Sequence, residues 1–226
     1  MTIEHESPSS DALLSATEAR ILGCLMEKQR TTPDQYPLTL NGLVSACNQK
    51  SARHPVMSLS QGEVGHVVNQ LRDRGLVHVS FTGRTERYDH KLVGTFLLSR
   101  EEQAILCALM LRGPQTSGEL RTNTARLADF RDLTQVVATL KGMIERDRPL
   151  VVELPRQPGR REERYAHRLC GAPALDEPAP ERDAQGADPT LEGRIETLET
   201  EVAELRAVLE RLAMRLAALD GASDAI

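Results

Sequence analysis

The sequence predicts a mainly α-helical protein with small β-hairpins, which is an α+β fold class. The first observation is an internal repeat, because residues 14–26 read LSATEARILGCLM and residues 98–110 read LSREEQAILCALM. The second is that both copies continue into segments with helical apolar spacing and then into strand-like segments. The third is a run of heptads near the C-terminus. One kind of domain is therefore expected twice, followed by a coiled-coil helix.

The first copy is expected to begin with a helix capped at Ser15. Glu18 follows three residues later, a spacing that lets the two side chains satisfy each other's free backbone N–H groups in a capping box. The same spacing recurs at Ser60 and Glu63. The elements expected after the first helix are a helix following Pro37, a helix over residues 60–74 and two strands joined at Thr82 and Gly83.

The second copy predicts the same elements in the same order. Its first helix is expected to start at Ser99, its second to lie within 116–127 and its third to cover 133–146. A hairpin is expected within 151–169. The apolar residues expected to face inward on the third helix are Leu133, Val136, Val137 and Leu140.

Three helices followed by a hairpin is the layout of a winged-helix domain. The sequence therefore predicts two tandem winged-helix domains, over residues 14–97 and 98–169, after a disordered N-terminus of residues 1–13. Residues 170–189 are rich in proline, glycine and acidic residues, and this composition predicts a linker with little fixed structure.

The C-terminal segment 190–220 predicts a coiled coil. Apolar residues recur there at alternating steps of four and three: Leu191, Ile195, Leu198, Val202, Leu205, Leu209, Leu212, Leu216 and Leu219. Ile and Val at a positions with Leu at d favour two strands, and the flanking charges pair attractively in a parallel arrangement, so a parallel homodimer is expected. Two alternatives stay open: a higher oligomer, and an amphipathic helix packed on its own chain.

A longer stretch carries a specific resemblance. Residues 36–64 read YPLTLNGLVSACNQKSARHPVMSLSQGEV and are followed by LRDRGLV at 71–77. These segments resemble the YceH-like family of uncharacterised bacterial proteins, whose fold is a tandem winged helix, and the similarity extends over both repeats. The resemblance implies the fold, and it implies no catalytic residue and no activity.

Composition and motifs narrow the functional classes. The chain has 226 residues and a formal net charge of −5, but each repeat alone carries a net charge of +3, because the acidic residues are concentrated in the tails. Among the patterns absent from the sequence are a membrane-length apolar run, a nucleotide-binding glycine loop, a serine-hydrolase motif and a metal-binding His/Cys spacing. We therefore expect a cytoplasmic, non-enzymatic protein without cofactor or metal. The scattered cysteines are expected to be buried thiols.

Candidate DNA-binding residues lie in the third helix, the loop before it and the hairpins. On the predicted third helix of the first repeat, His66 and Asn69 face away from the apolar stripe and are suited to reading base edges. Phosphate contacts are expected from the loop residues Lys50 and Arg53 and from the hairpin residues Arg84, Arg87, Arg160 and Arg161. The alternative for the loop is that it caps helix ends and packs Val56 and Met57 on the core. For the hairpin arginines the alternative is an ordinary solvated surface.

The corresponding face of the second repeat differs in character. The residues expected to face outward there are Gln135, Ala138, Gly142 and Glu145, which include no cation. This composition favours contact with a protein over contact with DNA. Two functional hypotheses result: a dimeric regulator that binds double-stranded DNA, and a scaffold that uses its domains for protein contacts alone.

Overall fold

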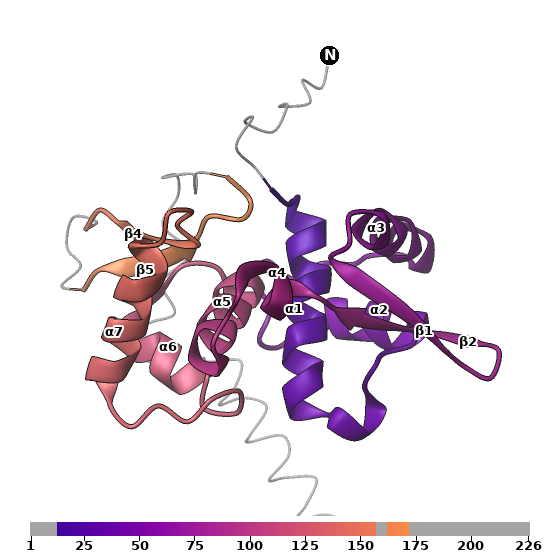
Figure 1. The fold of residues 1–226 in the computed structure, drawn as a ribbon, viewed down its shortest axis with the longest axis horizontal. Coiled ribbons are helices and arrows are strands. Elements are labelled where there is room, and N and C mark those ends of the chain that lie inside the picture. Colours follow the sequence, from indigo (N-terminus) through magenta and orange to yellow (C-terminus); the bar gives the residue numbers. More distant parts are fainter. Residues whose placement is uncertain (1–12, 157–161, 172–226) are drawn as a thin grey trace, which may run out of the picture. The chain divides into compact units, whose positions relative to one another are not determined.

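The computed structural model describes residues 13–156 and 162–171, all of which fall within one compact unit, Met1–Leu175. This part of the chain contains seven α-helices and five short strands in two small antiparallel sheets (Figure 1). The expected α+β class is therefore confirmed. The predicted N-terminal segment 1–13 lies outside the described residues except for Leu13, and so do the linker 170–189 beyond Gly171 and the heptads of 190–220.

The first repeat forms its elements close to the expected positions. They are α1 (Ala16–Thr31), the 3-10 helix η1 (Pro33–Gln35), α2 (Leu40–Cys47), α3 (Gln61–Asp73), β1 (Val77–Thr82), β2 (Thr85–His90) and α4 (Leu92–Phe96). Both predicted capping boxes are present, Ser15 with Glu18 and Ser60 with Glu63. The short helix α4, which leads into the second repeat, was not expected from the sequence.

The second repeat follows the same order with one extra strand. Its elements are α5 (Arg100–Arg112), β3 (Gln115–Thr116), α6 (Ser117–Asn123), α7 (Leu133–Ile144), β4 (Val151–Leu154) and β5 (Arg164–His167). The strand order β3-β5-β4 places β5 in the centre of this sheet. In the first repeat the corresponding contact of the hairpin is a single bridge between Leu38 and Tyr88.

The two hairpins are equivalent in register as well as in order. Val77 pairs with His90 in the first hairpin, and Val151 pairs with His167 in the second. Each hairpin is also fastened in the same way to the segment before the second helix. Arg87 Nη1 donates to the carbonyl oxygen of Pro37 at 2.8 Å, and Arg164 Nη2 donates to that of Pro114 at 2.6 Å. The repeat seen in the sequence is therefore a repeat of structure.

In each repeat an arginine after the third helix is bound to the start of the first helix. Arg74 Nη1 lies 2.6 Å from the Glu18 carboxylate, and Arg146 Nη2 lies 2.7 Å from both carboxylate oxygens of Glu102. The same glutamates close the capping boxes of α1 and α5. Each carboxylate thus links the C-terminal end of the third helix to the N-terminal end of the first helix and holds the two helices together.

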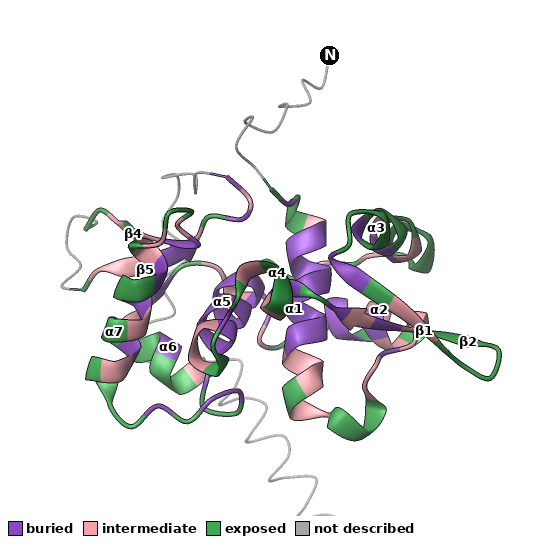
Figure 2. Ribbon diagram, viewed as in Figure 1, coloured by how far each residue is buried: buried purple, intermediate pink, exposed green. Residues whose placement is uncertain are grey.

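The cores of the two repeats are continuous through α1 and α5. Residues from both repeats belong to one cluster of buried apolar side chains, seen as adjoining purple segments in Figure 2. The two helices run antiparallel, since Arg30 near the end of α1 contacts Gln103 near the start of α5, while the carbonyl oxygen of Gly23 lies 3.4 Å from Cys107 Sγ. At Gly23 a Cβ atom would lie 2.9 Å from Leu111 Cδ2, so the absent side chain permits this close packing.

The prediction for the inward face of α7 was partly wrong. Val136 and Leu140 are buried as expected, but Leu133 and Val137 are 42% and 41% exposed. The third fully buried apolar side chain of the helix is Met143. The buried stripe therefore follows Val136, Leu140 and Met143 at helical spacing, and the two other apolar residues lie at its margin.

Candidate nucleic-acid interface

The exposed face of α3 is presented by a helix that is firmly packed on its other side. Val64, Val68 and Leu71 have no exposed surface and fix the rotation of α3 about its axis. This rotation leaves His66 and Asn69 exposed, as expected. Asn can donate to and accept from adenine in the major groove, and His can donate to or accept from base edges. The helix therefore presents two side chains with base-reading chemistry on a rigid support.

The loop between α2 and α3 is not a free basic segment, and Arg53 does not have the role expected of it. The Arg53 side chain has no exposed surface and forms an ion pair with Glu27, with Nη2 2.6 Å from Oε2 and Nη1 3.1 Å from Oε1. Its Nε donates to the carbonyl oxygen of Ala46, and its Nη2 donates to Gln49 Oε1. In this state Arg53 cannot reach a phosphate, and of the two loop cations only Lys50 is exposed.

A second buried arginine supports the same loop. Arg20 in α1 is 1% exposed, and it donates to the carbonyl oxygens of Cys47 at 3.1 Å and Pro55 at 2.5 Å. Asn48 pairs with the backbone of Leu59 in both directions at 2.8 Å. The structural alternative thus explains most of the polar residues of this loop, although not the apolar packing expected of Val56, which is 57% exposed.

Electrostatics agree with a structural role for the Arg53–Glu27 pair. Burial by itself raises the pKa of Glu27, but the hydrogen bonds and the positive charge of Arg53 outweigh it and hold that pKa below its usual value. The carboxylate is therefore ionised at neutral pH and matches the guanidinium charge. Sequence reasoning missed Glu27 because it precedes its partner by 26 residues and lies in another element.

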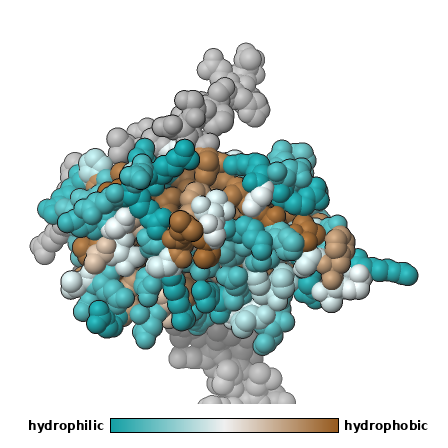
Figure 3. Space-filling view, viewed as in Figure 1, coloured by the Kyte–Doolittle hydropathy of each residue, from teal (hydrophilic) through white to brown (hydrophobic). Residues whose placement is uncertain are grey.

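The hairpin arginines divide into exposed and engaged residues. Arg84 lies at the turn between β1 and β2 and is exposed, and Figure 3 shows that the tip of this hairpin, at the right edge of the view, is hydrophilic. Arg87 is half-buried and bound to the Pro37 carbonyl group. Arg156 pairs with Glu163 in the second hairpin. Arg160 and Arg161 lie outside the described residues.

The equivalent face of the second repeat has a different chemistry. On α7 the exposed residues include Leu133, Val137, Ala138 and Gly142. This face combines small and apolar groups with the Lys141–Glu145 ion pair, whereas α3 exposes His66 and Asn69. The contrast expected from the sequence is therefore present, and the exposed Leu133 and Val137 increase it.

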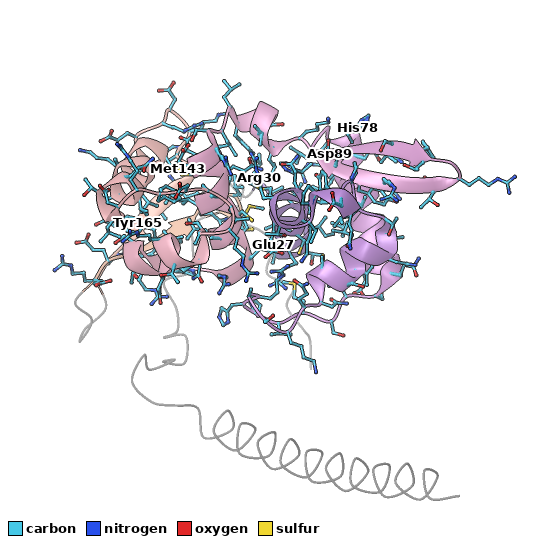
Figure 4. All side chains as sticks on the ribbon, turned by 90° about the horizontal axis from the view of Figure 1, so that it is seen from below. Glu27, Arg30, His78, Asp89, Met143 and Tyr165 are labelled. Carbon is cyan, nitrogen blue, oxygen red and sulfur yellow. The ribbon has the colours of Figure 1, made fainter. Side chains whose placement is uncertain are left out.

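A cavity of about 820 Å³ lies beside the junction of the two repeats. Its walls come from the end of α1, the end of β2, helix α4 and the start of α5. In Figure 4 Arg30 lies at the boundary between the two repeats, with Asp89 on the hairpin side. Sequence reasoning found no pocket, because Gln29 and Arg30 of α1 precede by about 60 residues the stretch from His90 to Gln103 that supplies the other walls.

His90 is a buried histidine at the edge of this cavity. Desolvation lowers its pKa to about 4; the smaller effect of Asp89 raises the pKa, and the cations Lys91 and Arg30 lower it further. Its equivalent in the second repeat, His167, also has a pKa lowered by desolvation to about 4. In both rings Nδ1 is buried without a hydrogen-bond partner. Both histidines are therefore neutral at pH 7.

Other classes of site find no support in the residues that the structure describes. Over 13–156 and 162–171 there is no cluster of three His, Cys, Asp or Glu side chains able to hold a metal ion, and no helix with the length and apolarity to cross a membrane. Cys24, Cys47 and Cys107 are buried free thiols, as expected, and Cys170 is half-buried.

Fold and surface together define a repeated α+β protein with two equivalent three-helix units and two different exposed third-helix faces. Comparison with known proteins adds the family. The family model described as "Protein of unknown function, DUF480" matches residues 14–160, and the chain belongs to this family. The uncharacterised bacterial family expected from the sequence is thereby confirmed.

The relatives extend the match over most of the chain. A UPF0502 protein of Aeromonas hydrophila is 46% identical over 217 residues, which cover 93% of this chain and 100% of the relative. A UPF0502 protein of Cellvibrio japonicus is 46% identical over 208 residues, covering 89% and 95%. One of Xanthomonas campestris is 47% identical over 211 residues, covering 90% and 94%. These names carry no activity that bears on the site.

Proposed function

We propose that the protein is a non-enzymatic regulator that binds double-stranded DNA through the first of two tandem winged-helix domains. The assignment of the winged-helix type is supported by the order of elements, three helices followed by an antiparallel hairpin, which occurs in both repeats. In helix-turn-helix proteins the last helix of such a unit enters the major groove. This role falls to α3.

The observation that carries the proposal is the exposed face of α3. His66 and Asn69 stand on a helix whose other side is fully buried, so their positions are fixed before DNA is bound. Gly62, on the same helix, has no heavy atom within 4 Å of the place where a Cβ would lie. A backbone can approach a base pair closely at such a position. The three residues together form a surface suited to the major groove.

The revised set of phosphate contacts is small. With Arg53 buried, the phosphate contacts proposed for the first repeat come from Lys50 and Arg84, which are both exposed, and from the half-buried Arg87. Each phosphate that a protein neutralises steepens the salt dependence of binding by about 0.9 in log–log slope. Few contacts imply a shallow slope and modest affinity, and the protein would need a second binding unit to bind tightly.

We propose that the second unit comes from dimerisation through residues 190–220. The heptads support a parallel two-stranded coiled coil, although they lie outside the described residues. Two first repeats held in one dimer bind neighbouring sites at a raised effective concentration. Truncation after Cys170 is expected to leave the repeats folded, to convert the dimer into a monomer in sedimentation and to weaken DNA binding.

A protein partner for the second repeat is the alternative function, and the exposed Leu133 and Val137 favour it. Their side chains lie with Ala138 and Gly142 on the exposed part of α7, where Lys141 is paired with Glu145 and Gln135 accepts a hydrogen bond from the Arg131 backbone. In the combined form of the two hypotheses, the first repeat binds DNA and the second contacts another protein. In the scaffold form, no DNA is bound at all.

The decisive experiment selects bound duplexes from a random double-stranded DNA pool and compares α3 and loop variants. His66→Ala and Asn69→Ala are expected to relax sequence preference, because base-edge contacts specify sequence. Lys50→Ala is expected to weaken binding to all sequences alike and to reduce the salt slope by about 0.9. Leu133→Ser with Val137→Ser is the matched control on α7 and is expected to leave both properties unchanged. A parent protein that enriches no duplex, or α3 variants that enrich the same duplexes as the parent, would overturn the proposal.

A further inference from the structure

Glu63 differs from the other glutamates that close capping boxes in the described part of the chain. Glu18, Glu102 and Glu119 each pair with an arginine as well, at 2.6, 2.7 and 3.3 Å. The hydrogen bonds of the Glu63 carboxylate all come from Ser60, whose backbone N and Oγ lie 2.7 and 2.6 Å from Oε2. Its second oxygen, Oε1, therefore receives no donor from the residues that the structure describes.

Ser60 fixes both the orientation and the charge of this carboxylate. The two hydrogen bonds to one oxygen hold the group against the first turn of α3. The bond from the Ser60 hydroxyl, and after it the bond from the Ser60 backbone, lowers the pKa of Glu63 below its usual value. Glu63 is exposed and ionised at neutral pH, so it presents to solvent a group that can accept hydrogen bonds and cannot donate them.

Glu63 lies on the same face of α3 as the two residues with base-reading chemistry. Glu63, His66 and Asn69 follow one another at intervals of three positions, which makes them neighbours along the helix surface, and all three are exposed. Asp73, an acid on the same helix, is paired with Arg72 at 3.1 Å. Glu63 is therefore the acid of this face whose charge is not matched by a described basic side chain.

The four bases offer very different partners to a carboxylate in the major groove. Guanine presents the acceptors N7 and O6, and thymine presents the acceptor O4 beside its methyl group. Adenine presents the N6 amino group next to the acceptor N7, whereas cytosine presents its N4 amino group alone. A carboxylate can only accept, so cytosine attracts it and every other base places an acceptor in its way. Phosphates repel it as well, because they carry the same charge.

We propose that Glu63 is a specificity-determining residue of the α3 face, whose free carboxylate oxygen accepts a hydrogen bond from the N4 amino group of a cytosine. The inference rests on the proposed function, since it assigns a base to a residue of the same surface. Glu63 and Asn69 are six positions apart, or about 9 Å along the helix axis at about 1.5 Å per residue. For a helix lying along the groove, this length corresponds to about two or three base pairs at about 3.4 Å each. The expected recognition element therefore carries C·G at one end and the A·T pair read by Asn69 at the other.

The test is a selection of bound duplexes from a random double-stranded DNA pool with the full-length parent and with Glu63→Gln. Glutamine closes a capping box as glutamate does, so the start of α3 is preserved, and equal thermal midpoints check this. The glutamine amide is suited to the N6 and N7 edge of adenine. The parent is expected to enrich cytosine at one fixed position of the selected duplexes. The variant is expected to enrich adenine at that position and to leave the other positions unchanged.

A matched control separates a base contact from the loss of one negative charge. Glu119→Gln makes the same change at the capping box of α6 in the second repeat, and it is expected to enrich the same duplexes as the parent. Affinities for single duplexes give a second readout. Thymine in place of the selected cytosine is expected to raise the Kd of the parent at least about fivefold, the lower end for one mismatched base pair. In Glu63→Gln this loss of affinity is expected to disappear.

Failure of this inference differs in outcome from failure of the proposed function. A parent that enriches no duplex would remove the proposed function and this inference with it. If the parent and Glu63→Gln enrich duplexes with the same base at every position, DNA binding stands and Glu63 serves only to cap α3. A change of base that Glu119→Gln reproduces would also overturn the inference, because it would follow from the charge of the protein rather than from a contact of Glu63.

Discussion

In the first repeat the loop before the third helix is held by two buried arginines, whereas the corresponding loop of the second repeat is held by apolar side chains. Arg20 and Arg53 hold the first loop through backbone carbonyl groups and Glu27. In the second loop Leu127 and Phe130 are buried instead. Its own arginines, Arg126 and Arg131, are exposed.

This difference shows that one framework accepts two physical solutions at the same position. A buried ion pair needs both partners and their hydrogen bonds, since removal of one partner leaves an uncompensated charge. A loop held by apolar side chains needs only side chains of the right volume that pack against the core, and it tolerates exchange among apolar residues of similar size. The first repeat is therefore more sensitive to charge and acid, and the second to changes of volume.

The largest effect is expected from breaking the polar loop. Arg53→Met should lower the free energy of unfolding by about 3–5 kcal/mol, because Glu27, whose side chain is only 17% exposed, keeps no partner but Lys28 at 3.5 Å, and the Ala46 carbonyl group loses its donor. Lys50→Met, in the same loop but exposed, should change it by less than about 0.5 kcal/mol. Urea denaturation of both variants measures the difference. Equal stabilities would mean that the ion pair does not hold the loop.

Acid should weaken both repeats through their equivalent histidines. The pKa of His90 and of His167 is about 4 in the folded protein, against about 6.5 in the unfolded chain. Because the folded-state pKa is depressed, the unfolded state binds more protons between pH 6.5 and 4. The contribution of each histidine to the free energy of unfolding is therefore complete above pH 6.5. It is lost as the pH falls toward 4, by about 3 kcal/mol for each histidine.

The two histidines can be separated by substitution. His90→Asn and His167→Asn should each reduce the loss of stability between pH 7 and pH 5, measured by urea denaturation at the two values. The pKa of Glu27 is also lowered, but its contribution is lost only below the usual glutamate pKa of about 4.3. If neither substitution changes the loss of unfolding free energy between pH 7 and pH 5, other groups titrate in this pH range.

A smaller effect is expected where the two repeats meet. Gly23→Ala should destabilise the protein by about 1–3 kcal/mol, because the new Cβ would lie 2.9 Å from Leu111 Cδ2 and 3.3 Å from Met110 Cβ. Gly62→Ala is the matched helical control on α3, with open space around it, and should stabilise the protein by about 0.5–1 kcal/mol. Thermal unfolding of the two variants measures whether Gly23→Ala lowers the midpoint and Gly62→Ala raises it. A stabilising Gly23→Ala would show that α1 and α5 separate at little cost.

The sequence predicted the elements well because their signals are local. The capping boxes at Ser15 and Ser60 are determined by residues three positions apart, and the first hairpin by its turn at Gly83. The inward face of α7 was harder, because Leu133 and Val137 are apolar at positions next to the stripe. Helical spacing alone does not show where a stripe ends.

The candidate site was predictable only in part, because whether a side chain is exposed or engaged depends on residues that are distant in the sequence. His66 and Asn69 are exposed as their helix position predicts. Arg53 looks in the sequence like any loop cation, and only the fold brings Glu27 to it. The cavity beside His90 forms where the end of α1 meets the stretch from His90 to Gln103, and no local pattern in the sequence could have indicated this long-range contact.

The antiparallel contact of α1 with α5 has the geometry of a symmetric pair of subunits contained in one polypeptide. In a pair of identical chains, any substitution at the centre appears on both sides at once. Gly23 of the first repeat and Cys107 of the second occupy equivalent positions, and in one chain the two positions can carry different residues. The Cys107 thiol lies 3.4 Å from the Gly23 carbonyl oxygen. A cysteine at both positions would bring a second side chain against Leu111. Duplication within one gene thus permits a tight, unequal contact that two identical chains could not make.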